Sequence, residues 1–305
     1  QETTHVFQDY QGGTIDSLEM FTLLQKNAYC NILVPSVHTS TESYQKLLHV
    51  SFDSEQKEPV IIPSDPIYTS SRIICSSSVS DGVRATIYSG MADGSVLATQ
   101  VENESTKQST ICFHQTLPVS SVSIDKYSSC LIAAYPDGSV HLDSSSSFYP
   151  QYGCNKVYSL GGGELAVLSS ATQHSFTHYV NQQPVLSIGC KESGTHFTCM
   201  TMNESSPNEI VLGCSDGTIE GYDIRNTERE LYSYKNHTAA ITSLSLVPGG
   251  VVSSSLDGCV LRKDGNGNVM RLLGDWSPIT SCIVGNDSKW IVAGGRTGNL
   301  FVIYF

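Results

Sequence analysis

The stretch Gly213–Arg225, which reads GCSDGTIEGYDIR, contains the pattern that decides the fold. A short apolar run leads into a turn that ends in Asp216-Gly217, and a second run rich in β-branched and aromatic residues follows. Asp-Gly is favoured in tight turns between antiparallel strands because these turns need positive φ, which glycine adopts without steric cost. The stretch therefore predicts two paired strands.

The same element recurs along the chain. Successive copies lie about 40 to 44 residues apart, except for one interval of about twice that length, which predicts a degenerate copy near Gln173-His174. One period before the first clear copy, Thr41–Ser43 lies between the apolar runs Asn31–Val34 and Leu47–Val50. The clear copies are Asp93-Gly94, Asp137-Gly138, Asp216-Gly217 and Asp257-Gly258, and the weaker one is Thr297-Gly298. Seven repeats result.

Seven repeats of this length, each with room for four short strands, predict an all-β fold, a seven-bladed β-propeller that forms a single domain over residues 1–305. For the fifth blade we expect strands at His196–Met202, Ile210–Cys214, Thr218–Ile224 and Glu230–Tyr234. The last blade is one strand short. We expect Thr4–Tyr10 to supply this strand and to cover an apolar edge that would otherwise promote aggregation.

Composition excludes several classes of function. The chain has 305 residues, of which 15% are charged, and a net charge of -12 with scattered Lys and Arg, so direct binding of nucleic acid is not expected. No apolar run approaches the roughly 18 to 20 residues that cross a bilayer, so no membrane insertion is expected. Residue 1 is Gln, which leaves open whether the true N-terminus is missing.

The ten cysteines raise the question of the compartment. Together with N-x-[ST] sequons at Asn103, Asn203, Asn236 and Asn286, they permit a secreted protein. The cysteines are evenly spread and mostly lie within apolar runs, as small core residues do, so we expect reduced thiols in the cytosol or nucleus.

The stretch Gly213–Arg225 resembles the end of a WD40 repeat, with Tyr222 where that family usually has Trp and with Asp223 after it. Asn236-His237 is similar to the Gly-His element of the next repeat. The resemblance implies a buried structural network of His237, Ser254 and Asp257 in the sixth blade, with Asp216 as the turn residue of the fifth. Lys263 replaces the aromatic member of this network.

Among WD40 proteins, the order of blades is similar to that of the WD40 nucleoporin in the Y-shaped outer-ring scaffold of the nuclear pore. A degenerate fourth blade is followed by Pro184–Gly189 and then by the best-formed blade, which ends in Asp-Ile-Arg. Members usually keep more Trp than the two present here, Trp276 and Trp290, and a longer insertion before the last blade. The resemblance implies a nuclear pore or nuclear envelope location, with the cytoplasm as the alternative.

Candidates for chemistry are few. His174 and His178 lie four residues apart on a predicted strand, about 13 Å, too far to share one metal ion. Cys112 and His114 share a strand face, as a nucleophile and its base would, but an outer-strand Cys beside a surface His is the favoured interpretation. Gly161–Gly163 and Gly265–Gly267 are interpreted as blade turns, and Ser144–Ser147 as a hairpin loop in the third blade. We expect no catalytic residues, cofactor, metal or small-molecule substrate.

The sequence thus favours a non-catalytic scaffold whose partners are other protein subunits of a multiprotein complex. Arg225 could instead be a docking residue, because an Asp-x-Arg at this place resembles the element used by WD40 substrate receptors of cullin-type ubiquitin ligases, or it could simply brace the blade with Asp223. Four tyrosines could anchor a partner or cap the blade packing: Tyr149, Tyr152, Tyr232 and Tyr234.

Overall fold

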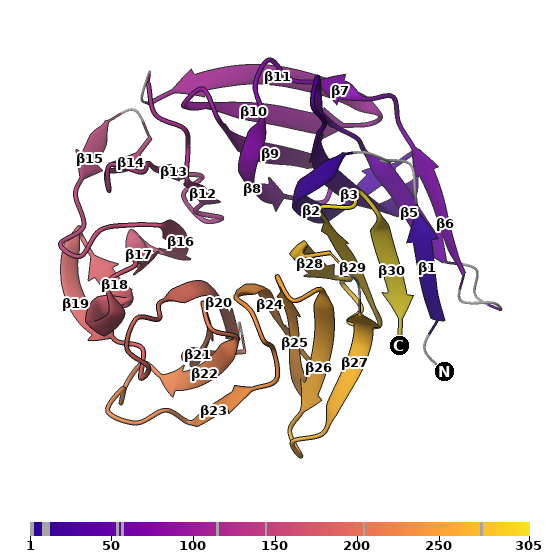
Figure 1. Cartoon of the computed structure of the whole chain (residues 1–305). Coiled ribbons are helices and arrows are strands. Elements are labelled where there is room, and N and C mark those ends of the chain that lie inside the picture. Colours follow the sequence, from indigo (N-terminus) through magenta and orange to yellow (C-terminus); the bar gives the residue numbers. More distant parts are fainter. Residues whose placement is uncertain are drawn as a thin grey trace. The chain divides into compact units, whose positions relative to one another are not determined.

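The computed structural model describes residues 3–7, 13–52, 55, 58–113, 116–143, 145–203, 205–274 and 277–305. Seven antiparallel sheets make up the fold, which is that of a seven-bladed β-propeller, as predicted (Figure 1). The chain divides into two compact units. Unit one comprises residues 1–15, 170–175 and 188–305, and unit two comprises residues 16–169 and 176–187.

Unit two contains the first four sheets in sequence order, here called blades one to four. Blades two and three each have four strands in simple succession. The strands of blade two are β8 (Ile73–Ser80), β9 (Arg84–Met91), β10 (Ser95–Glu102) and β11 (Ser105–Cys112), and those of blade three are β12 (Ser121–Ile124), β13 (Leu131–Ala134), β14 (Val140–Leu142) and β15 (Ser146–Phe148). Ser145 lies in the loop between β14 and β15, whereas Ser144 lies outside the described residues.

Blade one has six strands in place of the expected four. The predicted pairing of its two apolar runs is confirmed, because Asn31 pairs with Val50 and Leu33 with Leu48. The long strand β3 (Ala28–His38) also pairs with β2 and β4, which enlarges the sheet. The strands are β2 (Thr14–Gln25), β3 (Ala28–His38), β4 (Ser43–Gln45), β5 (Leu48–Phe52), β6 (Pro59–Pro63) and β7 (Ile67–Tyr68).

Blade four is the degenerate copy. Its middle strands, β17 (Glu164–Leu168) and β18 (Phe176–Val180), occupy the predicted residues, and the segment between them holds the short 3-10 helix η1 (Thr172–His174) in place of an Asp-Gly turn. The outer members are β16 (Lys156–Gly161) and β19 (Gln183–Ile188). The turn from β16 to β17 is Gly161–Gly163, with positive φ at all three glycines, as a blade turn requires.

Unit one contains blades five, six and seven. The strands of blade five lie within a few residues of their predicted places: β20 (Phe197–Asn203), β21 (Ser206–Cys214), β22 (Thr218–Asp223) and β23 (Tyr232–Lys235). Blade six has β24 (Ile241–Val247), β25 (Gly250–Ser255), β26 (Cys259–Asp264) and β27 (Val269–Gly274). Blade seven has β28 (Ile279–Val284), β29 (Trp290–Gly295) and β30 (Leu300–Tyr304).

The N-terminal strand completes blade seven, as predicted (Figure 1). β1 (Thr3–Phe7) pairs antiparallel with β30, so that Thr4 lies opposite Ile303 and Phe7 opposite Leu300. The remaining predicted residues of this strand, 8 to 10, lie outside the described part of the chain.

The core of unit one lies between successive blades. Val211 and Ile219 of blade five pack with Ile241 and Leu244 of blade six. The contact is close at Gly213, where a Cβ atom would overlap the side chain of Ile241. This packing sets the spacing of blades five and six, which carry the predicted site residues.

Candidate functional site

His237 is at the centre of a buried hydrogen-bond network in blade six. It precedes β24, and its side chain is fully buried. Its Nδ1 lies 3.0 Å from Oδ2 of Asp257, and its Nε2 lies 2.9 Å from Oγ of Ser253. The Asp257 carboxylate also accepts the backbone N–H groups of Thr238 and Cys259. The imidazole thereby ties the start of β24 to the turn between β25 and β26.

The hydroxyl in this network belongs to Ser253, not to the predicted Ser254. Successive side chains of a strand point to opposite faces, so a shift of one residue changes the partner completely. Ser254 instead lies 2.8 Å from the hydroxyl of Thr242 on β24. The WD40 resemblance thus indicated the right strand, β25, and the wrong face.

The geometry fixes the protonation of His237. Burial lowers the pKa of the imidazole and outweighs the opposing effect of Asp257, so the ring is neutral. Burial acts to raise the pKa of Asp257, but its hydrogen bonds to Thr238 and Cys259 hold this pKa below its usual value. A carboxylate only accepts hydrogen bonds, so Nδ1–H donates to Asp257 and Nε2 accepts from Ser253.

In blade five, Asp216 and Tyr222 serve different local contacts. Asp216 accepts the backbone N–H of Thr218 at 2.9 Å and its hydroxyl at 3.0 Å, which closes the turn. Tyr222, which is buried, donates its hydroxyl to Oε2 of Glu220 at 2.8 Å. Sequence reasoning missed Glu220, although a buried carboxylate two residues before a buried Tyr on one strand has the spacing for such a contact.

The other turn aspartates make the same contact as Asp216. The backbone N–H of Ser95 donates to Asp93 at 3.0 Å, and that of Ser139 donates to Asp137 at 2.9 Å. Each carboxylate is thus bonded within its own turn, where it stabilises the hairpin.

Arg225 braces the end of blade five. Its Nε and Nη2 donate to the two carboxylate oxygens of Asp223 at 3.0 and 2.7 Å, a bidentate pair. This pair lowers the pKa of Asp223 to about 2. The side chain of Arg225 is 68% exposed, so the guanidinium also faces solvent.

The histidine and cysteine candidates lie on separate elements. His174 belongs to η1 and not to the strand expected for it, because the degenerate copy lacks a strand-forming turn there. His178, on β18, pairs with Glu164 at 2.8 Å. Cys112 is exposed at the end of the outer strand β11, and its proposed companion His114 lies outside the described residues. Within the described ranges, no three His, Cys, Asp or Glu side chains gather as a metal site would require.

All ten cysteines lie within the described residues, and none of them is part of a disulfide. Burial raises the pKa of Cys154 and of Cys282 to about 12, so these thiols stay protonated at neutral pH. In the described part of the chain, no helix is long and apolar enough to cross a bilayer.

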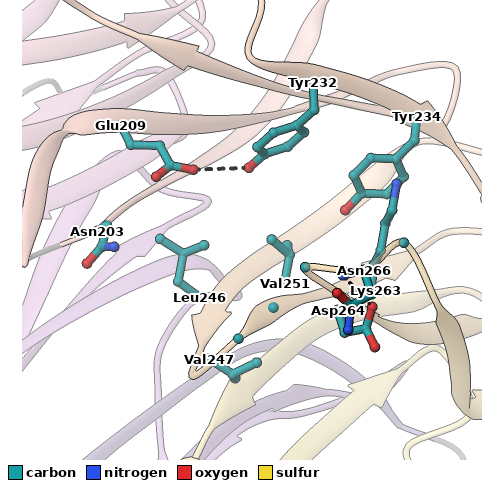
Figure 2. A pocket seen from close by; sticks show the side chains of 14 residues that line it. Asn203, Glu209, Tyr232, Tyr234, Leu246, Val247, Val251, Lys263, Asp264 and Asn266 are labelled. Atoms are coloured by element: carbon teal, nitrogen blue, oxygen red, sulfur yellow. Dashed lines mark hydrogen bonds between the residues drawn. The ribbon is translucent and has the colours of Figure 1, made fainter.

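A pocket of about 570 Å³ lies between blades five and six, at the end where the first and third turns of both blades are found. We call it the blade five–six groove. Figure 2 shows its lining: Tyr232 and Tyr234 of β23 form one wall, Leu246 and Val251 lie below them, and the turn after Lys263 closes one side. The predicted blade turn Gly265–Gly267 is part of that side.

The two tyrosine rings are held by their strand. Tyr232 and Tyr234 lie two residues apart on β23, so both point to the same face, with ring centroids 6.1 Å apart. Tyr232 packs over Gly221, where a Cβ atom would overlap its ring. Tyr149, which is 69% exposed, and Tyr152 follow blade three in unit two and do not line this groove.

Lys263 takes part in the groove, not in the His237 network. Its Nζ lies 3.5 Å from the centroid of the Tyr234 ring, a cation–π contact. The resemblance already indicated that Lys263 replaces an aromatic residue, and the structure shows that the ammonium group reaches across to blade five.

The chemistry of the groove suits binding. Burial raises the pKa of Tyr234 to about 12 and also raises that of Tyr232, so both phenols are neutral near pH 7. Neutral phenols do not act as general bases, but they donate hydrogen bonds and offer apolar ring faces. The sequence singled out the two tyrosines as partner anchors or as caps of the blade packing, and both rings do pack against the core cluster between the two blades. Glu209, Leu246 and Val251 became apparent only when two blades were placed together.

No family model matches the chain. The seven-bladed β-propeller, with an Asp-centred turn in blade five and a His–Ser–Asp network in blade six, is consistent with a WD40-type family. β-Propellers commonly mediate protein interactions, but a fold by itself does not define a function, which depends on the site.

Proposed function

We propose that this protein is a non-catalytic scaffold that binds other protein subunits of a multiprotein complex. The observation that carries the proposal is the blade five–six groove, where neutral aromatic and apolar side chains open to solvent between two firmly packed blades. Tyrosines in such positions are frequent anchors of protein interfaces. His237, Asp257 and Asp264 of blade six instead hold the turns of that blade together.

In its most specific form, the proposal makes the protein a structural subunit of the outer-ring Y subcomplex of the nuclear pore, located at the nuclear rim. This form rests on the order of the blades along the sequence: a degenerate blade four, which holds η1, precedes blade five, which ends in Asp-Ile-Arg. The support for this form is the resemblance of the sequence to that subfamily.

The experiment is purification of the tagged protein from native extract, followed by mass spectrometry and by imaging of the tagged protein in cells. We expect outer-ring nucleoporins in the purified material and signal at the nuclear rim. Recovery of other protein subunits without nucleoporins would overturn the nuclear pore form of the proposal. The more general proposal of a scaffold function would still stand. Recovery of no stable partner would overturn both.

A second candidate is a WD40 substrate receptor of a cullin-type ubiquitin ligase. The exposed guanidinium of Arg225 favours it, because the residue is available for docking while it braces Asp223. Replacement Arg225→Ala should then abolish binding of the ligase adaptor while the thermal unfolding transition stays cooperative. Adaptor binding that survives in the variant would eliminate this candidate.

A further inference from the structure

Two hydrogen-bond donors in the blade five–six groove have no acceptor among the residues that the structure describes. The Tyr234 hydroxyl is buried and has no hydrogen-bond partner among the described residues. The Lys263 ammonium lies over the same ring, and within the described ranges no carboxylate forms an ion pair with it. An unpaired buried hydroxyl destabilises a folded protein, so such a group points to a missing acceptor.

The acidic groups of the groove are already engaged. Glu209 lies 3.5 Å from the hydroxyl of Tyr232. Asp264 accepts the backbone N–H groups of Asn266 and Asn268, each at 2.9 Å, so its charge faces its own turn. The corner formed by Tyr234 and Lys263 therefore presents an ammonium group and a hydroxyl as donors, which are complementary to a carboxylate.

The remainder of the groove is apolar. Leu246 and Val251 lie below the tyrosine wall (Figure 2). The volume of about 570 Å³ falls within the range of roughly 300–1,000 Å³ typical of ligand pockets. It exceeds what a single carboxylate fills, so the occupant also needs an apolar part.

We propose that the blade five–six groove binds an extended acidic peptide segment of a partner protein. An Asp or Glu of the segment accepts hydrogen bonds from Lys263 and Tyr234, and a neighbouring aliphatic or aromatic side chain packs on Leu246 and Val251. In an extended segment, side chains two residues apart lie about 7 Å apart on one face, so a single short segment presents both groups to the groove. This inference rests on the proposed scaffold function.

The net charge of -12 does not prevent this contact. Charges separated by more than about 8 Å are largely screened at physiological ionic strength, so the Lys263 corner determines binding at short range.

The test begins with a phage-displayed library of random twelve-residue peptides, selected on the purified full chain and counter-selected on the Lys263→Glu variant. We expect the enriched peptides to combine Asp or Glu with a nearby Leu, Ile, Val, Phe or Trp. The most enriched peptide is then synthesised, and its dissociation constant is measured by fluorescence anisotropy.

Lys263→Glu should weaken binding of this peptide at least about tenfold, and Tyr234→Phe should weaken it by a smaller factor, because a charged hydrogen bond contributes more than a neutral one. Lys289→Glu, an equal charge change at an exposed site of blade seven, should leave binding unchanged. A peptide with Lys in place of its acidic residue should regain affinity for Lys263→Glu. Circular dichroism checks that each variant is folded.

Peptides enriched without an acidic residue, or equal loss of binding in Lys263→Glu and Lys289→Glu, would overturn the inference. So would the absence of any peptide that discriminates the wild type from Lys263→Glu. The purification from native extract distinguishes this failure from a failure of the scaffold function. If the same partners are recovered with the wild type and with Lys263→Glu, the protein is a scaffold, but its partners do not bind at the groove.

Discussion

His237 and Asp257 are 20 residues apart in sequence, yet Nδ1 of the first lies 3.0 Å from Oδ2 of the second. The contact joins the segment before β24 to the turn between β25 and β26. Because Ser253 holds the other ring nitrogen, the imidazole has a partner on both sides and its tautomer is defined. Blade six is thus stabilised by side-chain hydrogen bonds as well as by the backbone hydrogen bonds between its strands.

A double-mutant cycle should show that His237 is coupled to Ser253 and not to Ser254. Ser253→Ala leaves the buried Nε2 unpaired and should lower the free energy of unfolding by about 1–3 kcal/mol. With His237→Gln as the second change, the Ser253 cycle should give a coupling energy of at least about 0.5 kcal/mol, whereas the Ser254 cycle should be nearly additive. The free energy of unfolding is measured by urea unfolding for the four proteins of each cycle: the wild type, the two single variants and the double variant. Equal coupling in the two cycles would contradict the assignment.

The stability of the protein should decrease as the pH falls below about 6.5, in part because of His237. Burial keeps the folded imidazole neutral, while the unfolded chain takes up a proton near its usual pKa of 6.5. The unfolded state then binds more protons, so the free energy of unfolding falls with pH by at most about 1.4 kcal/mol per unit from this group. The lowered pKa of Asp257 acts in the same direction, but below its unfolded pKa of 3.8.

The measurement compares urea unfolding of the wild type and His237→Gln between pH 7.5 and 5. Glu220, whose pKa is raised by burial, contributes in the opposite direction, losing stability as the pH rises above 4.5, but it is common to both proteins. The wild type should therefore show the steeper loss on acidification. Parallel curves would contradict a buried neutral His237.

Gly217 should be far less tolerant of alanine than Gly138, although both follow a turn aspartate and both have positive φ, of 94° and 86°. A Cβ atom on Gly217 would overlap the carbonyl oxygen of His237, whereas a Cβ on Gly138 would meet open space. We expect Gly138→Ala to lower the free energy of unfolding by about 1 kcal/mol from backbone strain, and Gly217→Ala by about 2–4 kcal/mol. Thermal unfolding distinguishes them, and similar losses would contradict the close approach.

The repeats were predictable from sequence because the Asp-Gly turn is a local signal. Thr218–Ile224 was expected as a strand, and Thr218–Asp223 forms one, since turn chemistry and β-branched residues agree there. Blade one departed from the expected four strands because β3 is long enough to pair with β2, β4 and β5. The length of the sequence repeat alone does not predict this additional strand pairing.

The candidate site was less predictable. A one-residue difference, Ser253 against Ser254, changes the face of a strand, and a family resemblance does not resolve it. The groove needs residues from two blades, such as Tyr234 and Lys263, whose contact depends on how β23 and β26 pack. No local pattern in the sequence predicts how closely β23 and β26 approach each other.

Removal of residues 1–7 should destabilise blade seven. β1 pairs with β30 over five residues, and its loss exposes an apolar edge formed by Leu300, Val302 and their neighbours. We expect a lower melting temperature by circular dichroism and concentration-dependent association by light scattering. Val6→Ser provides the control, because the Val6 side chain is 47% exposed and its replacement keeps the strand pairing. A truncated protein that melts like the wild type and stays monomeric would contradict the role of this strand.

Removal of a tyrosine hydroxyl should have opposite effects at two sites in blade five. In Tyr222→Phe, the buried Glu220 carboxylate loses its donor, which should lower the free energy of unfolding by about 1–3 kcal/mol. In Tyr234→Phe, the hydroxyl removed is buried and has no partner in the described part of the chain, so the free energy of unfolding should stay unchanged or rise by up to about 1 kcal/mol. Urea unfolding of both variants at pH 7 gives the comparison. A loss at Tyr234 as large as that at Tyr222 would show that the Tyr234 hydroxyl has a partner within the protein, and the groove would then lack the free donor on which peptide binding depends.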